Sequence, residues 1–140
     1  MNFENDKCVI VIDENLPLGI IANTAAILGI TLGMKYPSVV GCDVKDADNN
    51  IHSGIIEFPV PILKSNRNAL NALSKTLKEE FFDDLTIVDF TDLAQSCKTY
   101  DEYISKMTET PAQLLNNIGL LIYGNKKKVN KLTGNMPLLR

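Results

Sequence analysis

The stretch that decides the fold runs from Lys7 to Met34 and reads KCVIVIDENLPLGIIANTAAILGITLGM. It opens with five consecutive apolar residues, Cys8 to Ile12, most of them β-branched. Such a run is typical of a strand that is buried on both faces, as in a sheet covered by helices. Asn15 is a candidate helix cap, and Pro17 suits the first turn of a helix, where its missing N–H is not needed. The stretch therefore predicts a buried strand followed directly by a helix.

The predicted helix carries no charge from Leu18 to Met34 and is apolar on nearly every side. A helix of this kind lies either in a protein core or in a membrane. The acidic leader, the strand before the helix and the polar residues Asn23, Thr24 and Thr31 favour a central helix packed on the sheet. Its smallest side chains recur at helical spacing, at Ala22, Ala26, Gly29 and Gly33. This stripe would let a second backbone approach closely, including one from a partner subunit.

Length and composition predict one soluble domain over residues 1–140. The chain is 45% hydrophobic and 22% charged, which is ordinary for a globular protein. Its net charge is −3 and its pI is about 5.1, so no overall positive field attracts nucleic acid or anionic lipid. The three cysteines show no C-x-x-C spacing, and no signal peptide is recognisable. We expect a cytoplasmic protein with free thiols.

The rest of the chain alternates between strand and helix patterns. Polar residues 45–50 separate two strand patterns and indicate a hairpin, and the prolines that follow it predict an extended edge segment. Thr99 to Glu102 form a capping box that starts a later helix. The predicted elements are strands at 39–44 and 51–58, an edge segment at 59–63, a helix from Ser65 or Asn66 to about Phe82, a strand at 85–90, a helix from about 100, a strand at 118–123 and a helix at 126–133. This order predicts an α/β domain with a mixed sheet.

The two ends of the chain resemble the type II peptidyl-tRNA hydrolases. NLPLG at 15–19 resembles that family's D-L-K-M-G turn, and LLIYG at 120–124 with VNKLTGNMPLL at 129–139 resembles its closing strand and V-T-G-H-L-K-L-L tail. Over nearly the whole chain, the patterns DE-LP-G, V-K-DAD-N-HSGI, VDFTD-AQS and VNKLTG-PLLR resemble the related family called domain of unknown function 2000 (DUF2000). The resemblance implies a three-layer α/β/α sandwich around a short mixed sheet, commonly dimeric. It implies no known activity.

The chain departs from the hydrolases at their functional positions. The hydrolase lysines around the first turn, and the glutamine and histidine of the first helix, fall at Pro17, Ile20, Ala22, Ala26 and Gly29. The threonine that leads into the last strand falls at Gly119. Asp89 alone matches, at the position of the family's strand-end aspartate. The resemblance therefore does not predict the hydrolase active site, and Asp89 is the candidate catalytic residue if the chain is an enzyme.

Polar residues gather where two predicted strands end. In open α/β sheets, ligands bind outside the carboxyl ends of the strands. If the first strand and the strand at 85–90 are parallel neighbours, Asp13, Asp89 and Asp92 converge and suit acid–base work or a hard cation. Alternatively, Asp13 and Asp92 are helix caps, and Asn23 and Thr24 make buried hydrogen bonds to a neighbouring strand instead of lining a pocket. The predicted ligand site comprises Asp13, Asn15, Asn23, Thr24, Thr91 and Asp92, with Asp89 as the catalytic candidate.

No other motif in the sequence indicates a particular reaction or ligand. His52 is the only histidine, and it forms either a pair with a nearby aspartate, Asp46 or Asp48, or part of a solvated hairpin end. Lys126, Lys127, Lys128 and Lys131 make one basic cluster, which suits an anionic partner or a solvated face. The sequence holds no dinucleotide, P-loop or zinc-protease motif, so we predict no cofactor and no metal.

Three hypotheses about function remain. The first is a module that binds or senses a small molecule at the strand ends. The second is a hydrolase of an ester or amide that uses Asp89 as its base. The third is a homodimeric interaction protein that associates through the small-residue helix or a strand edge. We favour the first, with self-association as a companion property, and we expect neither nucleic acid nor a membrane as a partner.

Overall fold

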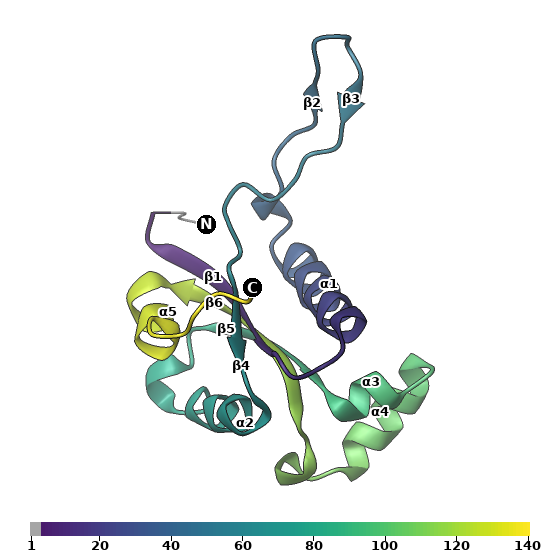
Figure 1. Ribbon diagram of the computed structural model, residues 1–140, viewed down its shortest axis with the longest axis vertical. Coiled ribbons are helices and arrows are strands. Elements are labelled where there is room, and N and C mark those ends of the chain that lie inside the picture. Colours follow the sequence, from purple (N-terminus) through teal and green to yellow (C-terminus); the bar gives the residue numbers. More distant parts are fainter. Residues whose placement is uncertain (1–3) are drawn as a thin grey trace.

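The computed structural model describes residues 4–140 and contains a four-stranded mixed sheet. The strand order is β4-β1-β6-β5, with β1 parallel to β4 and β6 antiparallel to both β1 and β5 (Figure 1). The strands span Asp6–Asp13 (β1), Ile62–Ser65 (β4), Thr86–Thr91 (β5) and Asn117–Asn125 (β6). The helices span Leu18–Lys35 (α1), Arg67–Thr76 (α2), Asp92–Ser96 (α3), Tyr100–Glu109 (α4) and Lys126–Thr133 (α5). Short 3₁₀ turns lie at Pro37–Val39, Glu80–Phe82 and Ala112–Leu114.

Helices cover both faces of the sheet. Residues of β1 alternate between the two faces: Ile10 and Ile12 pack with Leu28 and Leu32 of α1. Val9 and Val11 pack on the opposite face with Leu70 of α2 and Val129 of α5. The predicted α/β domain with a mixed sheet between helical layers is therefore confirmed, and the continuous apolar runs of β1 and β6 reflect burial on both faces.

Several boundaries differ from the sequence-based predictions. The N-cap position of α1 is Pro17, which provides no side-chain cap, so the prediction of Asn15 as the cap is wrong. The helix predicted to reach Phe82 ends at Thr76, because the backbone becomes extended at Glu79 before the 3₁₀ turn. This break lets Phe82 reach the same apolar cluster as Leu77.

The helix α1 packs on the sheet, as predicted, and its outer side is exposed. By length and composition, α1 could cross a bilayer. In this structure only 22% of its residues are buried. Ile21, Thr24, Leu28 and Leu32 are its buried residues, and they form the side that faces the sheet. The other sides present apolar residues to solvent.

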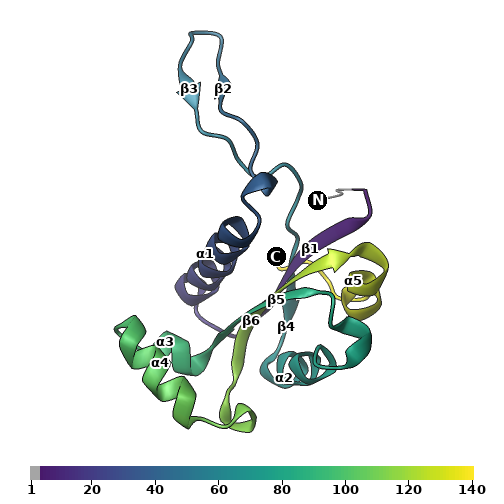
Figure 2. The same ribbon diagram turned by 180° about the vertical axis from the view of Figure 1, so that it is seen from behind.

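The predicted hairpin projects away from the body as an arm (Figures 1 and 2). Its paired residues are Val44–Lys45 (β2) and Ile51–His52 (β3), with one further bridge between Val40 and Ile56. We call residues 40–56 the arm. Its regular pairing is much shorter than the predicted strands at 39–44 and 51–58, because the two strands pair only near the tip and again at the base, where the Gly41 N–H donates to the Ile55 carbonyl.

Candidate functional site

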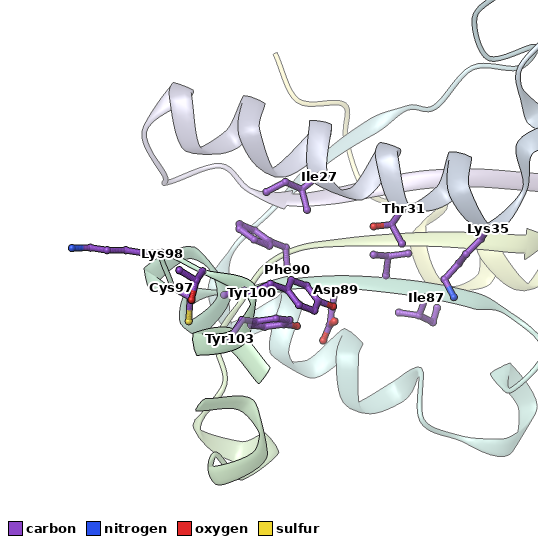
Figure 3. Close-up of a pocket in the computed structure, with 13 residues that line it drawn as sticks. Ile27, Thr31, Lys35, Ile87, Asp89, Phe90, Cys97, Lys98, Tyr100 and Tyr103 are labelled. Carbon is purple, nitrogen blue, oxygen red and sulfur yellow. The ribbon is translucent and has the colours of Figure 1, made fainter. Parts of the chain in front are cut away.

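A cavity of about 450 Å³ lies between α1, β5 and the segment from α3 to α4 (Figure 3). Its walls mix aliphatic, aromatic and charged side chains. The lining residues are Ile27, Thr31, Lys35, Ile87, Val88, Asp89, Phe90, Ala94, Cys97, Lys98, Thr99, Tyr100 and Tyr103. Its volume falls within the range of small-molecule sites in proteins.

Two helix caps position the outer wall of this cavity. Thr91, the last residue of β5, accepts a hydrogen bond from the Ala94 N–H through its Oγ1 at 3.3 Å and so starts α3. Thr99 accepts a hydrogen bond from the Glu102 N–H at 3.1 Å and starts α4, as the capping box predicts. The first turn of α4 then places the Tyr100 and Tyr103 rings edge to face, with 5.5 Å between their centroids. The caps therefore turn a pair of aromatic rings toward β5.

The charged groups of the cavity are uncommitted. Within the described part of the chain, the Asp89 carboxylate makes no hydrogen bond or salt bridge to another side chain. Figure 3 shows the two tyrosine rings beside Asp89 and Lys35 extending from α1 toward Ile87, whereas Lys98 points outward. Burial, followed by the negative charge of Asp89, raises the pKa of Tyr103, so its hydroxyl remains a hydrogen-bond donor at neutral pH.

Asp13 does not join Asp89 as the strand-end hypothesis required. β1 and β5 run in the same direction, but β6 lies between them, so they are not neighbours. Asp13 is buried, and its Oδ1 accepts a hydrogen bond from the Asn15 N–H at 3.0 Å. Neither Asp13 nor Asn15 lines the cavity that contains Asp89.

The two polar residues predicted from the first helix also lie outside the cavity. Thr24 is fully buried, and its hydroxyl donates a hydrogen bond to the Ile20 carbonyl at 2.7 Å. Asn23 is exposed on α1. The alternative prediction, a buried hydrogen bond to a neighbouring strand, is also wrong, because Thr24 bonds to a carbonyl of its own helix and Asn23 is exposed.

Thr91 and Asp92 have structural partners at the end of β5. Asp92 Oδ1 accepts hydrogen bonds from the Leu93 N–H at 2.8 Å and the Asn116 N–H at 3.1 Å, and its Oδ2 accepts one from Asn116 Nδ2 at 3.0 Å. Partial burial would raise the pKa of Asp92, but these hydrogen bonds outweigh burial and lower it. Asp92 therefore ties the start of α3 to the segment that enters β6, and neither residue lines the cavity with Asp89.

Asp89 is thus the one predicted site residue that the cavity contains. Sequence analysis missed its partners Lys35, Cys97, Tyr100 and Tyr103. One signal was available, because Tyr100 and Tyr103 are spaced to share a face of the helix that follows Asp89 by ten residues. The contribution of Thr31 and Lys35 required knowledge of which side of α1 borders β5.

The remaining candidates lie apart from this cavity. At the tip of the arm, His52 Nε2 is 2.9 Å from Asp46 Oδ2, and both side chains are largely solvent-accessible. Lys128 of the basic cluster forms a 2.8 Å salt bridge with Asp84. Among residues 4–140, no group of three or more histidine, cysteine, aspartate or glutamate side chains is placed to hold a metal ion.

Comparisons with known proteins place the chain among proteins of unknown function. A search of the curated proteins finds no match. A protein of unknown function from Agrobacterium tumefaciens strain C58 has a similar solved structure, with a TM-score of 0.86 and 14% sequence identity over 97% of this chain and 98% of that one. At this identity the likeness concerns the fold alone. The family described as "Protein of unknown function (DUF2000)" matches residues 6–140, and the chain belongs to that family.

Proposed function

We propose that this protein binds a small molecule in the cavity between α1, β5 and α4. The observation that carries the proposal is that one cavity is lined by two charges of opposite sign without side-chain partners among the described residues, Asp89 and Lys35, together with aliphatic and aromatic side chains. Charged side chains at a cavity wall fix the orientation of a ligand, and the apolar wall provides most of its buried area. The absence of disulfides among the three cysteines supports a cytoplasmic location for this role.

The chemistry of the walls favours amino acids and their simple derivatives. A carboxylate such as Asp89 attracts an ammonium group, and the Lys35 ammonium attracts a carboxylate. Phe90, Tyr100 and Tyr103 offer rings for an aliphatic or aromatic side chain. A zwitterion with an apolar side chain satisfies all three features, whereas a polyphosphate meets only two lysines and would lie near Asp89.

Hydrolysis of an ester or amide is the alternative activity for the same cavity. Asp89 would take a proton from water as the water oxygen attacks the carbonyl carbon, and the Tyr103 hydroxyl would donate a hydrogen bond to the developing oxyanion. We also propose that the fold is related to that of type II peptidyl-tRNA hydrolases. The position of Asp89 in the second half of β5, beside the cavity that α1 borders, supports that relation.

Isothermal titration calorimetry with a matched ligand set tests the binding proposal. The set comprises leucine and phenylalanine, their N-acetyl forms, which lack the ammonium charge, and their methyl esters, which lack the carboxylate. Asp89→Asn should weaken binding of the free amino acids by about tenfold to a hundredfold, the value of a charge-assisted hydrogen bond, and should remove the preference over N-acetyl forms. Lys35→Gln should remove the preference over methyl esters.

Two exposed residues outside the cavity provide matched controls. Asp83→Asn and Lys127→Gln make the same chemical changes and should leave affinities unchanged. Binding that is equal in Asp89→Asn and Asp83→Asn would overturn the proposed site, and no binding by any member of the set would overturn the ligand class. Release of alcohol from the methyl esters that stops in Asp89→Asn would establish the hydrolase alternative.

A further inference from the structure

A second hollow, of about 390 Å³, lies beside α2 and shares no lining residue with the cavity that contains Asp89. Its walls come from α2 and the residues directly after it, from the 3₁₀ turn Ala112–Leu114 and from the start of β6. We call it the α2 hollow. Most of its lining residues are polar, and the full set is Asn71, Ser74, Lys75, Lys78, Ala112, Gln113, Leu115 and Asn117.

One side-chain oxygen in the wall of the α2 hollow lacks a hydrogen-bond partner. Among residues 4–140, Asn117 Oδ1 is the one buried side-chain nitrogen or oxygen without a partner, and Asn117 is only 7% exposed. A buried acceptor that receives no hydrogen bond destabilises a protein, and such groups are rare in folded chains. The position of this oxygen in the wall of a hollow suggests that its donor belongs to a ligand.

The neighbours of Asn117 fix the orientation of its amide. Asn71 Oδ1 accepts a hydrogen bond from Asn117 Nδ2 at 3.1 Å and another from the Asn117 backbone N–H at 3.0 Å. Asn71 Nδ2 in turn donates to Asn116 Oδ1 at 3.2 Å. Reversal of the Asn117 amide would set its oxygen against Asn71 Oδ1, so the nitrogen faces Asn71 and the oxygen remains for another donor.

Two positive charges border the same hollow. Lys75 and Lys78 are exposed, and their side chains make no hydrogen bond or salt bridge with the described residues. Positive charges are favourable at the C-terminal end of a helix, which explains part of their placement at the end of α2. That effect does not explain why the wall between α2 and β6 is polar and contains an unpaired acceptor. A ligand with an anionic group and a hydrogen-bond donor would satisfy both features.

We propose that the α2 hollow binds a phosphorylated sugar, with a hydroxyl group donating to Asn117 Oδ1 and the phosphate contacting Lys75 and Lys78. A hydroxyl is the donor that the Asn117 oxygen lacks, and a phosphate forms charge-assisted hydrogen bonds with ammonium groups. Further sugar hydroxyls can pair with Ser74 and Gln113, whose side chains make no hydrogen bond with the described residues. The volume falls within the range of small-molecule sites.

The composition of the walls favours a sugar over a nucleotide or an amino acid. Of the described residues, no aromatic side chain lines the α2 hollow, so a nucleobase would have no ring on which to stack. The residues that line it also include no carboxylate to attract an ammonium group. Ala112 and Leu115 are its apolar residues, and they offer little surface to an apolar side chain. In these respects the α2 hollow differs from the cavity beside β5.

A small movement of the wall would give a ligand access to the covered oxygen of Asn117. Lys75, Lys78 and Gln113 are exposed, and no hydrogen bond to the described residues holds their side chains in place. Their rotation therefore costs little, whereas Asn117 itself is held by Asn71. The acceptor is thus fixed in position while the side chains around it can adapt to a ligand.

Isothermal titration calorimetry of the full chain at low salt tests the site. The probes are glucose 6-phosphate, fructose 6-phosphate and ribose 5-phosphate, with glucose and inorganic phosphate as controls that each lack one half of the ligand. At least one sugar phosphate should bind more tightly than both controls. Lys75→Gln/Lys78→Gln should weaken its binding about tenfold, because two charge-assisted contacts are lost. Lys126→Gln/Lys127→Gln removes two exposed charges from α5 and should leave the affinity unchanged.

Asn117→Ala separates the hydroxyl contact from the attraction between charges. The affinity for the sugar phosphate should fall about twofold to tenfold, the value of one neutral hydrogen bond, while the affinity for inorganic phosphate stays the same. The variant should fold, because Asn71 Oδ1 still accepts from the backbone N–H of residue 117. Asn23→Ala makes the same change on the exposed surface of α1 and should not alter either affinity.

NMR of the side-chain amides provides a second readout. The Asn117 Nδ2 signals, identified by their absence in Asn117→Ala, should shift with the sugar phosphate and not with inorganic phosphate, because only the sugar donates to Oδ1. Absence of binding by all three sugar phosphates, or equal weakening by the two pairs of lysine substitutions, would overturn the proposal. Equal affinity of the sugar phosphate for the wild type and Asn117→Ala would overturn it in favour of phosphate attracted to surface lysines alone.

Discussion

The methyl group of Thr24 in α1 packs so closely on Gly119 in β6 that a Cβ on Gly119 would lie 2.7 Å from it. This contact brings α1 onto the sheet near the end where β5 and β6 pair beside the cavity. Gly119→Ala should therefore destabilise the protein by about 1–3 kcal/mol, the usual result of overpacking a core. Denaturant unfolding monitored by circular dichroism measures the change.

A compensating substitution provides the control for this contact. Thr24→Ser removes the methyl group but keeps the hydroxyl that donates to the Ile20 carbonyl. The double variant Thr24→Ser/Gly119→Ala should recover most of the stability lost in Gly119→Ala, since it moves one methyl group across the contact. Additive losses in the double-mutant cycle would show that the two side chains do not compete for this space.

Local sequence patterns were sufficient for most elements of the fold. The five apolar residues of β1, the helix from Leu18 and the capping box at Thr99 each act over a few neighbouring residues, and the structure confirms all three. Strand order depends on pairing between distant segments, and no local pattern shows that β6 enters between β1 and β5. For this reason Asp89 was found as a candidate while Asp13 was grouped with it.

Prediction of the cavity would also have required knowledge of which distant segments lie side by side. Lys35 and Thr31 look like ordinary helix residues in the sequence, and they become wall residues only because that side of α1 borders β5. The sequence pattern also could not show that the outer side of α1 is exposed. The hydrophobic pattern of an apolar helix is the same whether its outer side is covered by its own chain or by another molecule.

The cysteines offer a chemical test of the cavity. Burial raises the pKa of Cys8 to about 12, so this thiol should not react with iodoacetamide in the folded protein at pH 8. Cys42 is exposed on the arm and should react readily, while Cys97 lies in the cavity wall and is half-buried. A ligand in the cavity should slow alkylation of Cys97 and leave that of Cys42 unchanged. Mass spectrometry of peptides after timed labelling measures each site, and equal protection of both thiols would argue against binding in this cavity.

Asp92 should act on stability and not on ligand affinity. Its carboxylate accepts two hydrogen bonds from Asn116 and one from the Leu93 N–H, so Asp92→Ala should lower the free energy of unfolding by about 1–3 kcal/mol. Because the pKa of Asp92 is lowered in the folded state, this stabilisation is present above the ordinary aspartate pKa and is lost as pH falls through the lowered value. Unfolding curves at pH 7 and pH 3 should therefore show a smaller difference between variant and wild type at the lower pH. A ligand affinity that falls in Asp92→Ala while stability is unchanged would instead assign Asp92 to the binding site.

The hydrogen bond between Asp46 and His52 should determine the pH below which the Asp46 carboxylate no longer stabilises the turn of the arm. The hydrogen bond with His52, followed by that from the Asn50 N–H, lowers the pKa of Asp46 from 3.8 to about 2. A lowered pKa means that the carboxylate stabilises the folded turn above pH 3.8 and that this contribution disappears as pH falls through about 2. In His52→Ala, the pKa of Asp46 should rise toward its ordinary value, because the largest cause of the shift is gone. Carbon-detected NMR of the carboxyl groups measures this titration, with Asp43 as the internal reference, since its carboxylate accepts from the Gly54 N–H and not from His52. An Asp46 titration that does not move in His52→Ala would show that the N–H groups of Asp48 and Asn50 hold the turn by themselves.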